Sequence, residues 1–224
     1  MCCRYIDFSG NGLQSLSTGN ISNATVDRLT TLDLSRNAIS DTIPAFLTNM
    51  RLQHLKLYAN DFSGSIPDLI FTDTLIDVDL SHNRLSGPIP SSLWHASLRD
   101  VNFEHNQLSG TISNAIGGIG EDAVYVDIRL ANNLFSGVVP SAIGSMSNLD
   151  VLDVSHNRLT GLIPVIGNID GSLLLSLEGN DFDCPLPSPT TLYGNAGANC
   201  TCRAGMYGDF VMQVDAGVGR THAC

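Results

Sequence analysis

The segment from Leu75 to Pro90 reads Leu-Ile-Asp-Val-Asp-Leu-Ser-His-Asn-Arg-Leu-Ser-Gly-Pro-Ile-Pro, and the same pattern of residue types returns before and after it. Its asparagine recurs at eight positions, separated by 26, 23, 23, 23, 27, 24 and 23 residues. Self-similarity at a fixed period of about 20 to 50 residues indicates a chain built from stacked repeats. The recurring asparagines are Asn11, Asn37, Asn60, Asn83, Asn106, Asn133, Asn157 and Asn180.

Apolar residues occupy three fixed positions around each asparagine. In this segment they are Val78 and Leu80, five and three residues before Asn83, and Leu85, two residues after it. The alternation before the asparagine is typical of a strand with one buried side. One such strand cannot bury that side alone, so we expect stacked copies to form a parallel sheet over one continuous core. We expect each asparagine amide to bond to the backbone of its own and the next coil, because a buried polar group needs partners.

Five repeats continue after the asparagine with a Leu/Phe-Ser/Thr-Gly-x-Ile/Val-Pro motif, which in one of them ends before the proline. These motifs lie at residues 62–67, 85–90, 108–112, 135–140 and 159–164. The motif resembles the plant-type leucine-rich repeats of receptor-like kinases, receptor-like proteins and polygalacturonase-inhibiting proteins, over roughly Tyr5 to Pro187. That resemblance implies a leucine-rich-repeat right-handed solenoid, mainly parallel β, with short 3-10 or helical segments on its convex face. In this family the motif also adds a short second strand, where a proline at the sheet edge is tolerated.

The predicted organisation is a solenoid of eight repeats over residues 1–187, followed by residues 188–224 as a C-terminal cysteine-rich cap or the start of a truncated module. The tail from Cys200 to Gly208 resembles the start of an EGF-like or ephrin-receptor-like module. Six cysteines allow 15 pairings, and pairing of Cys184 with Cys200 or Cys202 would close the cap. A zinc site from the Cys-x-Cys pair and His222 is the alternative to oxidised cysteines. The disulfide candidates are Cys2, Cys3, Cys184, Cys200, Cys202 and Cys224.

Composition and motifs together place the protein outside the cell or at its surface. Asn20, Asn23 and Asn199 begin triplets that match the N-glycosylation acceptor sequence. No apolar run approaches the roughly 20 residues of a transmembrane helix, so we predict no membrane insertion by this segment. The start of the chain does not read as a secretory signal, so we expect a piece of a larger multidomain surface protein or assembly. With 22 acidic against 11 basic residues, net charge −11, the chain is unsuited to nucleic acid but suited to a basic ligand.

Two columns of residues are predicted to face outward on the concave side of the sheet. The first column is Tyr5, Thr31, His54, Asp77, Asp100, Asp127, Val151 and Leu174, and the second is Asp7, Asp33, Lys56, Asp79, Asn102, Arg129, Asp153 and Ser176. Neighbouring strands lie about 4.8 Å apart, so the central aspartates should form one acidic patch. Stacked like charges cost stability, which hints at a ligand-binding role, and a solvated acidic face is the alternative interpretation. The family consensus Leu-Asp-Leu-Ser offers a competing explanation for aspartate in the second column.

The predicted function is non-enzymatic recognition of a protein or peptide ligand, basic in character, lying across the concave sheet, with no cofactor. Two alternatives stay open: a structural spacer or matrix component of a larger cell-surface assembly, and, by family analogy, an inhibitor of a secreted glycosidase. The predicted ligand-binding residues are His54, Lys56, Asp77, Asp79, Asp100, Asn102, Asp127 and Arg129.

Catalytic and metal sites are not predicted. Ser81 and His82 look like a nucleophile and base, but side chains adjacent in a strand diverge and cannot form the required hydrogen bond. His82 and His105 lie on adjacent repeats and could reach one metal ion, although exposed polar residues at strand ends are the favoured interpretation. The 27-residue step contains residues 117–122, rich in glycine, where we expect a flexible loop on the convex side.

Overall fold

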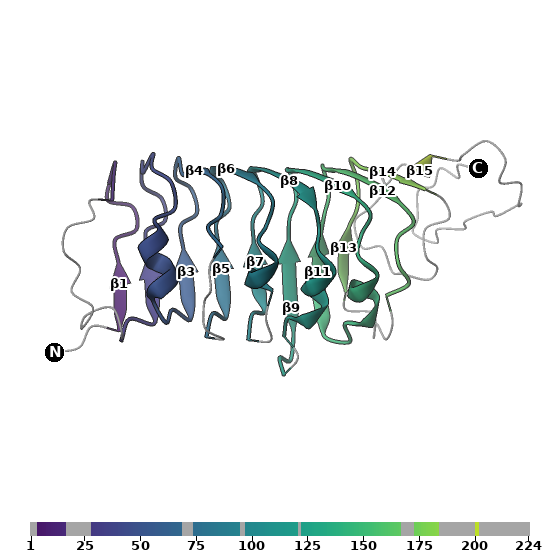
Figure 1. Cartoon of the computed structure of the whole chain (residues 1–224), viewed down its shortest axis with the longest axis horizontal. Helices are drawn as coiled ribbons and strands as arrows, with labels where there is room; N and C mark the ends of the chain where they lie inside the picture. The colour runs from purple at the N-terminus through teal and green to yellow at the C-terminus, as the bar shows by residue number, and fades with distance from the viewer. Residues whose placement is uncertain are drawn as a thin grey trace, which may run out of the picture.

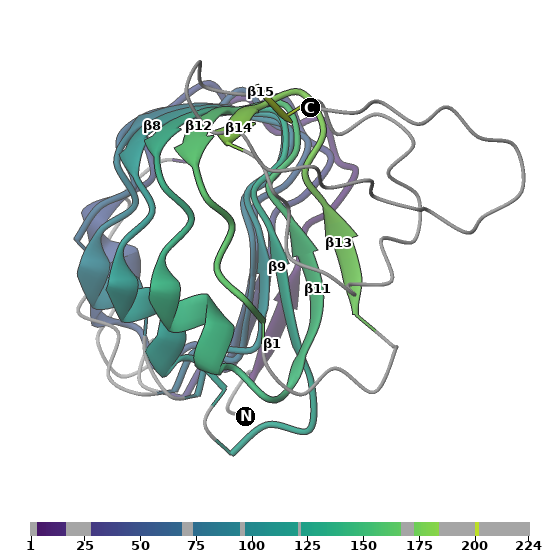
Figure 2. The same ribbon diagram turned by 90° about the vertical axis from the view of Figure 1, so that its right-hand side faces the viewer.

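The computed structural model describes residues 4–16, 28–68, 74–94, 97–120, 122–166, 173–183 and 200–201. Within these residues the chain winds through coils that stack side by side along one long axis (Figure 1). Seen along that axis, the coils from the third onward pass through a main sheet and then a second sheet, and 3-10 turns lie on the side opposite the main sheet (Figure 2). The predicted solenoid of parallel strands with short 3-10 segments is confirmed.

The main sheet holds one strand from each of the eight described coils, all paired in parallel. Its order is β1-β2-β3-β5-β7-β9-β11-β13, so each strand pairs with the strand of the next coil. The strands are β1 (Tyr5–Asp7), β2 (Thr31–Asp33), β3 (His54–Lys56), β5 (Asp77–Asp79), β7 (Asp100–Asn102), β9 (Val126–Arg129), β11 (Leu149–Asp153) and β13 (Leu174–Ser176).

The second sheet includes the Ser/Thr-Gly part of the five repeat motifs, as the family resemblance implies, and four of these five strands begin directly after the asparagine. Its strands are β4 (Ser63–Gly64), β6 (Arg84–Gly87), β8 (Gln107–Thr111), β10 (Leu134–Gly137), β12 (Arg158–Gly161), β14 (Asp181–Asp183) and β15 (Cys200–Thr201). Strand β15 lies within residues 188–224 and pairs with β14, with Phe182 opposite Cys200. The second sheet therefore continues past the predicted end of the solenoid at residue 187.

Short 3-10 segments return the chain from the second sheet to the main sheet. Those that the structure describes are η1 (Ala45–Asn49), η2 (Ser91–Leu93), η3 (Asn114–Gly118) and η4 (Ser141–Ser145). Proline stands directly before η1, η2 and η4, where the missing backbone donor costs nothing. Before η3 stands Ser113, whose hydroxyl accepts a hydrogen bond from the Ala115 N–H at 3.2 Å. The motif thus ends one strand and begins the next turn.

The three repeating apolar positions form the core. Val78, Leu80 and Leu85 are each at most 1% exposed, and the equivalent residues of the other central coils are buried in the same way. The first coil differs, because the described chain packs against it on one side alone. Phe8 of that coil is 53% exposed, although the repeat places it at a core position. Burial of a Leu-sized side chain is worth about 1.5 to 3 kcal/mol, so the central coils carry most of the stability.

The asparagines of the second to eighth coils form a ladder of side-chain hydrogen bonds. Asn83 donates from Nδ2 to the carbonyls of Leu80, Ser81 and Leu57, the last in the preceding coil, at 3.0 to 3.1 Å. Its Oδ1 accepts from the Phe62 N–H at 2.9 Å. Asn37, Asn60, Asn106, Asn133, Asn157 and Asn180 repeat this arrangement, half-buried or buried. Asn11 is exposed and donates within its own coil, to the Ser9 carbonyl at 3.0 Å.

Several predictions fall on residues outside the described ranges. Among them are the side chains of all the disulfide candidates, including Cys200, of which the structure describes the backbone. His222 and the glycosylation candidates Asn20, Asn23 and Asn199 also lie outside the described ranges. In the described part of the chain, no helix combines the length and the apolar character that crossing a membrane requires.

Candidate functional site

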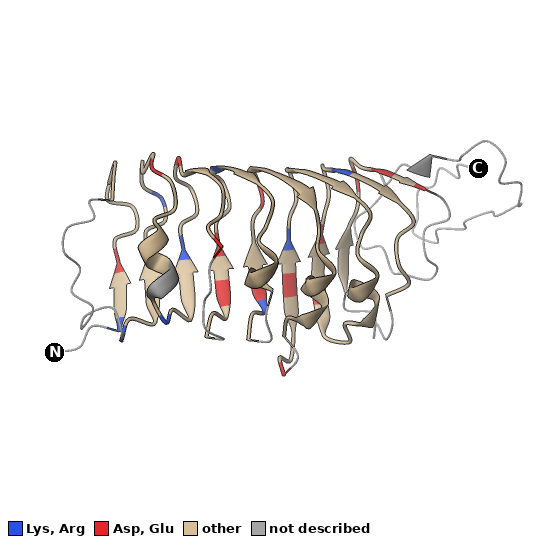
Figure 3. Ribbon diagram, viewed as in Figure 1, with Lys and Arg blue, Asp and Glu red and all other residues tan. Residues whose placement is uncertain are grey.

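The two outward columns lie in the predicted register. Parallel pairing aligns His54 with Asp77, Asp77 with Asp100, and Asp100 with Asp127. The second column aligns in the same way through Lys56, Asp79, Asn102 and Arg129. These eight residues, here called the charged block, occupy four consecutive strands on the outer face of the main sheet, where Figure 3 shows acidic and basic residues on adjacent strands. We call Asp77, Asp100 and Asp127 the acidic column.

Two nitrogen-bearing side chains, His54 and Arg129, pair with parts of the acidic column. Nδ1 of His54 lies 2.5 Å from Oδ2 of Asp77. Arg129 contacts Asp127 at 2.8 Å and reaches across to Asp100 at 3.5 Å. All five side chains keep solvent access, with exposed fractions between 17% and 41%. Surface pairs of this kind are worth about 0 to 1 kcal/mol each, so an incoming cation can compete with them.

The second-column aspartates accept hydrogen bonds that hold the turn after their strands. This use is consistent with the family consensus Leu-Asp-Leu-Ser, the competing explanation for aspartate in this column. Oδ1 of Asp79 accepts hydrogen bonds from the Ser81 N–H at 2.9 Å and the Ser81 hydroxyl at 2.6 Å. Asp33 and Asp153 bond in the same way to the serine two residues later. Asn102 accepts from the Glu104 N–H at 3.1 Å. Asp79 and Asn102 therefore help to shape the turn after their strands, whatever else they bind.

Burial and neighbouring carboxylates raise the pKa of two acidic side chains in and beside the charged block. Burial raises the pKa of Asp100, and Asp127, Asp77 and Asp79 raise it further against the opposing effect of Arg129. Glu104 shares this environment: burial raises its pKa first, with Asp153 and Asp79 adding to the effect and Arg129 and His82 opposing it. Sequence reasoning missed Glu104. Its position, two residues before the asparagine of the fifth coil, holds serine in four of the eight coils, and this departure from the repeat could have indicated it.

His82, His105 and His156 each stand directly before the asparagine of their coil, and we call them the histidine row. The rings of His82 and His105 stack with centroids 4.4 Å apart and planes 17° from parallel. Burial lowers the pKa of His105, and His82 and His156 lower it further. No group of three His, Cys, Asp or Glu side chains among the described residues is placed to hold a metal ion. Ser81 is buried, and its hydroxyl donates a hydrogen bond to Asp79 and not to His82.

The histidine row has left-handed backbone, a conformation in which histidine and asparagine occur more often than most residues. The residue before the asparagine has φ between 52° and 56° at Arg36, Ala59, His82, His105, Asn132 and His156. This conformation costs a residue with a Cβ roughly 1 to 3 kcal/mol and persists where neighbouring structure enforces it. The asparagine ladder supplies that enforcement, since it holds the turn from both sides.

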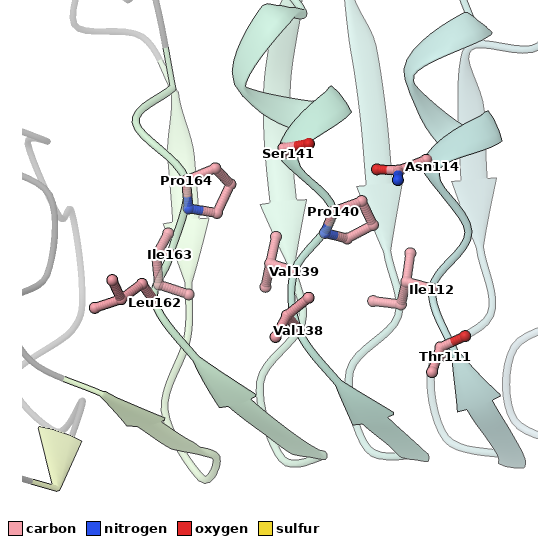
Figure 4. A pocket seen from close by; sticks show the side chains of 10 residues that line it. All are labelled: Thr111, Ile112, Asn114, Val138, Val139, Pro140, Ser141, Leu162, Ile163 and Pro164. Atoms are coloured by element: carbon pink, nitrogen blue, oxygen red, sulfur yellow. The ribbon is translucent and has the colours of Figure 1, made fainter. Parts of the chain in front are cut away.

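A second surface lies along the outer face of the second sheet. The variable residue of each Ser-Gly-x motif packs over the glycine of the next coil: a Cβ on Gly161 would lie 2.8 Å from Cγ1 of Val138. Val138 and Leu162 are 55% and 54% exposed. With Thr111 they flank a shallow groove of about 730 Å³, here called the side groove (Figure 4). Its lining also includes the buried side chains of Ile112, Val139 and Ile163.

Comparison with known proteins relates the repeats and the fold to characterised families. The family model described as Leucine Rich Repeat matches residues 28–50, 74–96, 97–119 and 148–168. The fold is similar to that of the Arabidopsis receptor kinase HAESA in complex with the peptide hormone IDA and the co-receptor SERK1, at 30% identity and a TM-score of 0.71. The match covers 81% of this chain and 31% of HAESA.

Two further solved structures are informative. The PEPR1-AtPEP1 structure is 31% identical with a TM-score of 0.71, and the match covers 81% of this chain and 25% of that one. A plant ice-binding protein is 28% identical with a TM-score of 0.63, and the match covers 71% of this chain and 52% of that one. The chain thus spans about a third or less of these receptor chains and about half of the ice-binding protein. No curated protein matches the sequence.

Proposed function

We propose that this leucine-rich-repeat solenoid, whose fold is shared with plant receptor-kinase ectodomains, is a recognition module that binds an extended basic peptide on the charged block. The observation that carries the proposal is the acidic column, in which three carboxylates stand side by side on consecutive strands. Like charges directly opposite on a sheet are destabilising. A guanidinium or ammonium group lying across these strands would relieve that repulsion, so the cost in the free protein becomes affinity in the complex.

The dimensions of the face suit a peptide. Eight strands about 4.8 Å apart give a surface of roughly 40 Å. An extended peptide advances about 3.3 Å per residue, so about ten to twelve residues would span it. Similarity to plant receptor-kinase ectodomains, one of them that of HAESA solved with a peptide hormone ligand, supports this choice of ligand and an extracellular or cell-surface location. Those receptors are longer, and the ligand of this chain is inferred from its own charges.

A peptide array tests the proposal. The probes are immobilised Gly/Ser decapeptides that contain three arginines, three glutamates or no charge. The parent protein is expected to bind the arginine peptides best, and binding is expected to weaken as ionic strength rises. Asp77→Lys combined with Asp100→Lys is expected to abolish that binding.

A control separates the charged block from overall charge. Asp181→Lys with Asp183→Lys makes the same charge change on β14 of the second sheet. This variant is expected to bind arginine peptides within about twofold of the parent. Equal binding by the parent and by the Asp77/Asp100 variant would refute the proposed function. Lack of peptide binding by the parent would refute it too, and would favour the spacer role.

A second candidate function rests on the second sheet. Two uncharged rows run across five coils at this sheet and directly after its strands, Ser63, Ser86, Ser109, Ser136 and Thr160, and Ser65, Pro88, Thr111, Val138 and Leu162. A third row beside them holds Asp61, Arg84 and Arg158, with Arg84 paired to Asp61 at 2.7 Å. Regularly spaced hydroxyl and methyl groups in the two uncharged rows could order water, since charges hold their own hydration shells strongly. With the similarity to a plant ice-binding protein, this favours ice binding as the second candidate.

Thermal hysteresis of freezing tests this second candidate. The parent is expected to show hysteresis, and Thr111→Lys with Leu162→Lys is expected to remove most of it. The Asp77→Lys, Asp100→Lys variant should keep it, because its substitutions lie on the main sheet. A parent protein without hysteresis would refute ice binding and leave the peptide proposal untouched.

A further inference from the structure

The sixth coil exposes two apolar side chains directly before β9. Val124 is 90% exposed and Tyr125 is 41% exposed. At the repeat position of Tyr125, counted from the asparagine, five other coils have a leucine with at most 6% of its surface exposed. These leucines are Leu29, Leu52, Leu75, Leu98 and Leu149. Tyr125 has therefore left a position that is buried elsewhere.

A shift of one residue accounts for this exposure. Val126 is fully buried and takes the place in the core that Tyr125 would fill. The pairing of β9 with β11 shows the same shift: Leu149 aligns with Val126, and Val151 aligns with Asp127. The extra residue in β11 is a bulge, a feature common where a sheet re-aims side chains. The 27-residue repeat thus satisfies its core with a valine and places a tyrosine at the surface.

The turn that leads to this pair is held by hydrogen bonds. The Ala123 N–H donates to the Gly120 carbonyl at 2.9 Å. The side-chain amide of Asn148, from the next coil, donates to the carbonyls of Gly120 and Ala123 at 2.6 and 3.0 Å. Gly120 has a left-handed φ of 65°, and a Cβ there would lie 2.3 Å from Cγ2 of Val126. The predicted flexible loop is, in its described residues, a bonded turn at the start of a main-sheet strand.

The turn lies at the edge of the charged block. Figure 1 shows the segment before β9 projecting beyond the starts of the neighbouring strands. Tyr125 precedes Asp127 of the acidic column by two residues, so their Cα atoms are at most about 7 Å apart. A peptide that crosses the other strands but runs along β9 at this point would match this spacing, because side chains two positions apart in an extended peptide are separated by about 6.6 Å.

We infer that Val124 and Tyr125 form an apolar subsite for the same peptide, which would carry a basic residue and, two positions away, a large apolar residue. This inference rests on the proposed function and adds a sequence signature to it. The basic residue lies at Asp100 and Asp127, and the apolar residue covers Val124 and Tyr125. A pre-formed turn loses little conformational entropy on binding, so it can discriminate between ligands that a mobile loop would bind alike.

The test scans an apolar residue past a fixed charge. The probes are immobilised Gly/Ser decapeptides with one central arginine and a single leucine moved through the other positions, together with a leucine-free peptide. The parent is expected to bind peptides with leucine two positions from arginine about tenfold better than the leucine-free peptide. Val124→Ser with Tyr125→Ser is expected to lose this preference and to keep its affinity for the leucine-free peptide. Both replaced side chains are exposed, so folding should be preserved.

Controls distinguish the failure of each proposal. Leu162→Ser with Val165→Ser removes exposed apolar surface elsewhere and is expected to keep the preference. Asp77→Asn with Asp100→Asn is expected to weaken binding of every arginine peptide. Loss of binding in that variant, with no leucine preference in the parent, would overturn the subsite and leave the proposed function standing. A turn variant that keeps the preference, or changes only self-association measured by light scattering, would also overturn the subsite.

Discussion

His54 and Asp77 face each other across β3 and β5, with Nδ1 of the histidine 2.5 Å from Oδ2 of the aspartate. The pair occupies the first carboxylate of the acidic column before any ligand arrives. An arginine of a bound peptide must displace the imidazole or share the carboxylate with it. His54 thus limits how much of the acidic column a ligand can use.

Removal of this competitor should strengthen peptide binding. His54→Asn is expected to raise the affinity for arginine decapeptides about threefold at neutral pH, because the imidazole then no longer occupies the Asp77 carboxylate. Fluorescence anisotropy of a labelled peptide gives the change in Kd. His156→Asn, in the row beside the asparagines, is the matched control and should leave Kd unchanged. Weaker binding by His54→Asn would mean that the histidine itself contacts the ligand.

Neutralising Asp100 should stabilise the fold while it weakens binding. The raised pKa of Asp100 means that the folded state binds its proton more tightly than the unfolded state does. Its contribution is therefore most favourable at acid pH and is lost as pH rises through the unfolded and then the folded pKa. Asp100→Asn should increase the free energy of unfolding by about 0.5 kcal/mol at pH 7, the scale of a cross-strand pair.

Urea denaturation at two pH values checks this prediction. The difference between Asp100→Asn and the parent should vanish near pH 3, where the aspartate is protonated in both states. Asp153→Asn serves as the control, because it weakens the acceptor for the N–H and hydroxyl of Ser155 and should destabilise. A destabilised Asp100→Asn at pH 7 would show that its contact with Arg129 outweighs the repulsion.

The asparagine ladder should be worth more in the middle of the solenoid than at its start. Asn83→Ala removes three donated bonds and leaves the buried Phe62 N–H without its acceptor. A cost of about 2 to 4 kcal/mol is expected, because buried groups left unsatisfied cost about 1 to 3 kcal/mol each. Asn11→Ala, on an exposed residue, should cost less than about 1 kcal/mol. Similar losses in the two variants, measured by chemical denaturation, would contradict the ladder.

Gly161 of the second sheet is expected to be required for stability, because of its backbone conformation and because of the space available at its Cα. Gly161 has a left-handed φ of 76°, and Val138 fills the space where its Cβ would be. Gly161→Ala should lower the free energy of unfolding by about 1 to 2 kcal/mol. Combination with Val138→Ala should restore part of it, since the clash is relieved and the backbone strain remains. Gly118→Ala is the control, because a Cβ there has no neighbour within 4 Å. Full restoration by Val138→Ala would show that strain is negligible.

Periodicity predicted the coils, their stacking and the register of the outward columns, since these follow from which residues must be buried together. It did not predict Phe8, whose repeat position is apolar but whose coil is covered on one side. It also missed Tyr125, because within the 27-residue step a buried valine next in sequence replaces the expected leucine, outside the three apolar positions that define the repeat. The position of Asp79 in the outward column predicted a ligand-binding role. Its hydrogen bonds to Ser81 depend on the geometry of the turn, which the spacing of residues does not reveal.

The position of the ligand is the central claim, and amide chemical-shift mapping tests it most directly. An arginine decapeptide titrated into isotopically labelled protein should shift the amides of β5, β7 and β9, with the largest changes at Asp77, Asp100 and Asp127. Smaller shifts should extend to Tyr125 and fade along β1 and β13. Shifts confined to β8, β10 and β12 of the second sheet would contradict binding on the charged block.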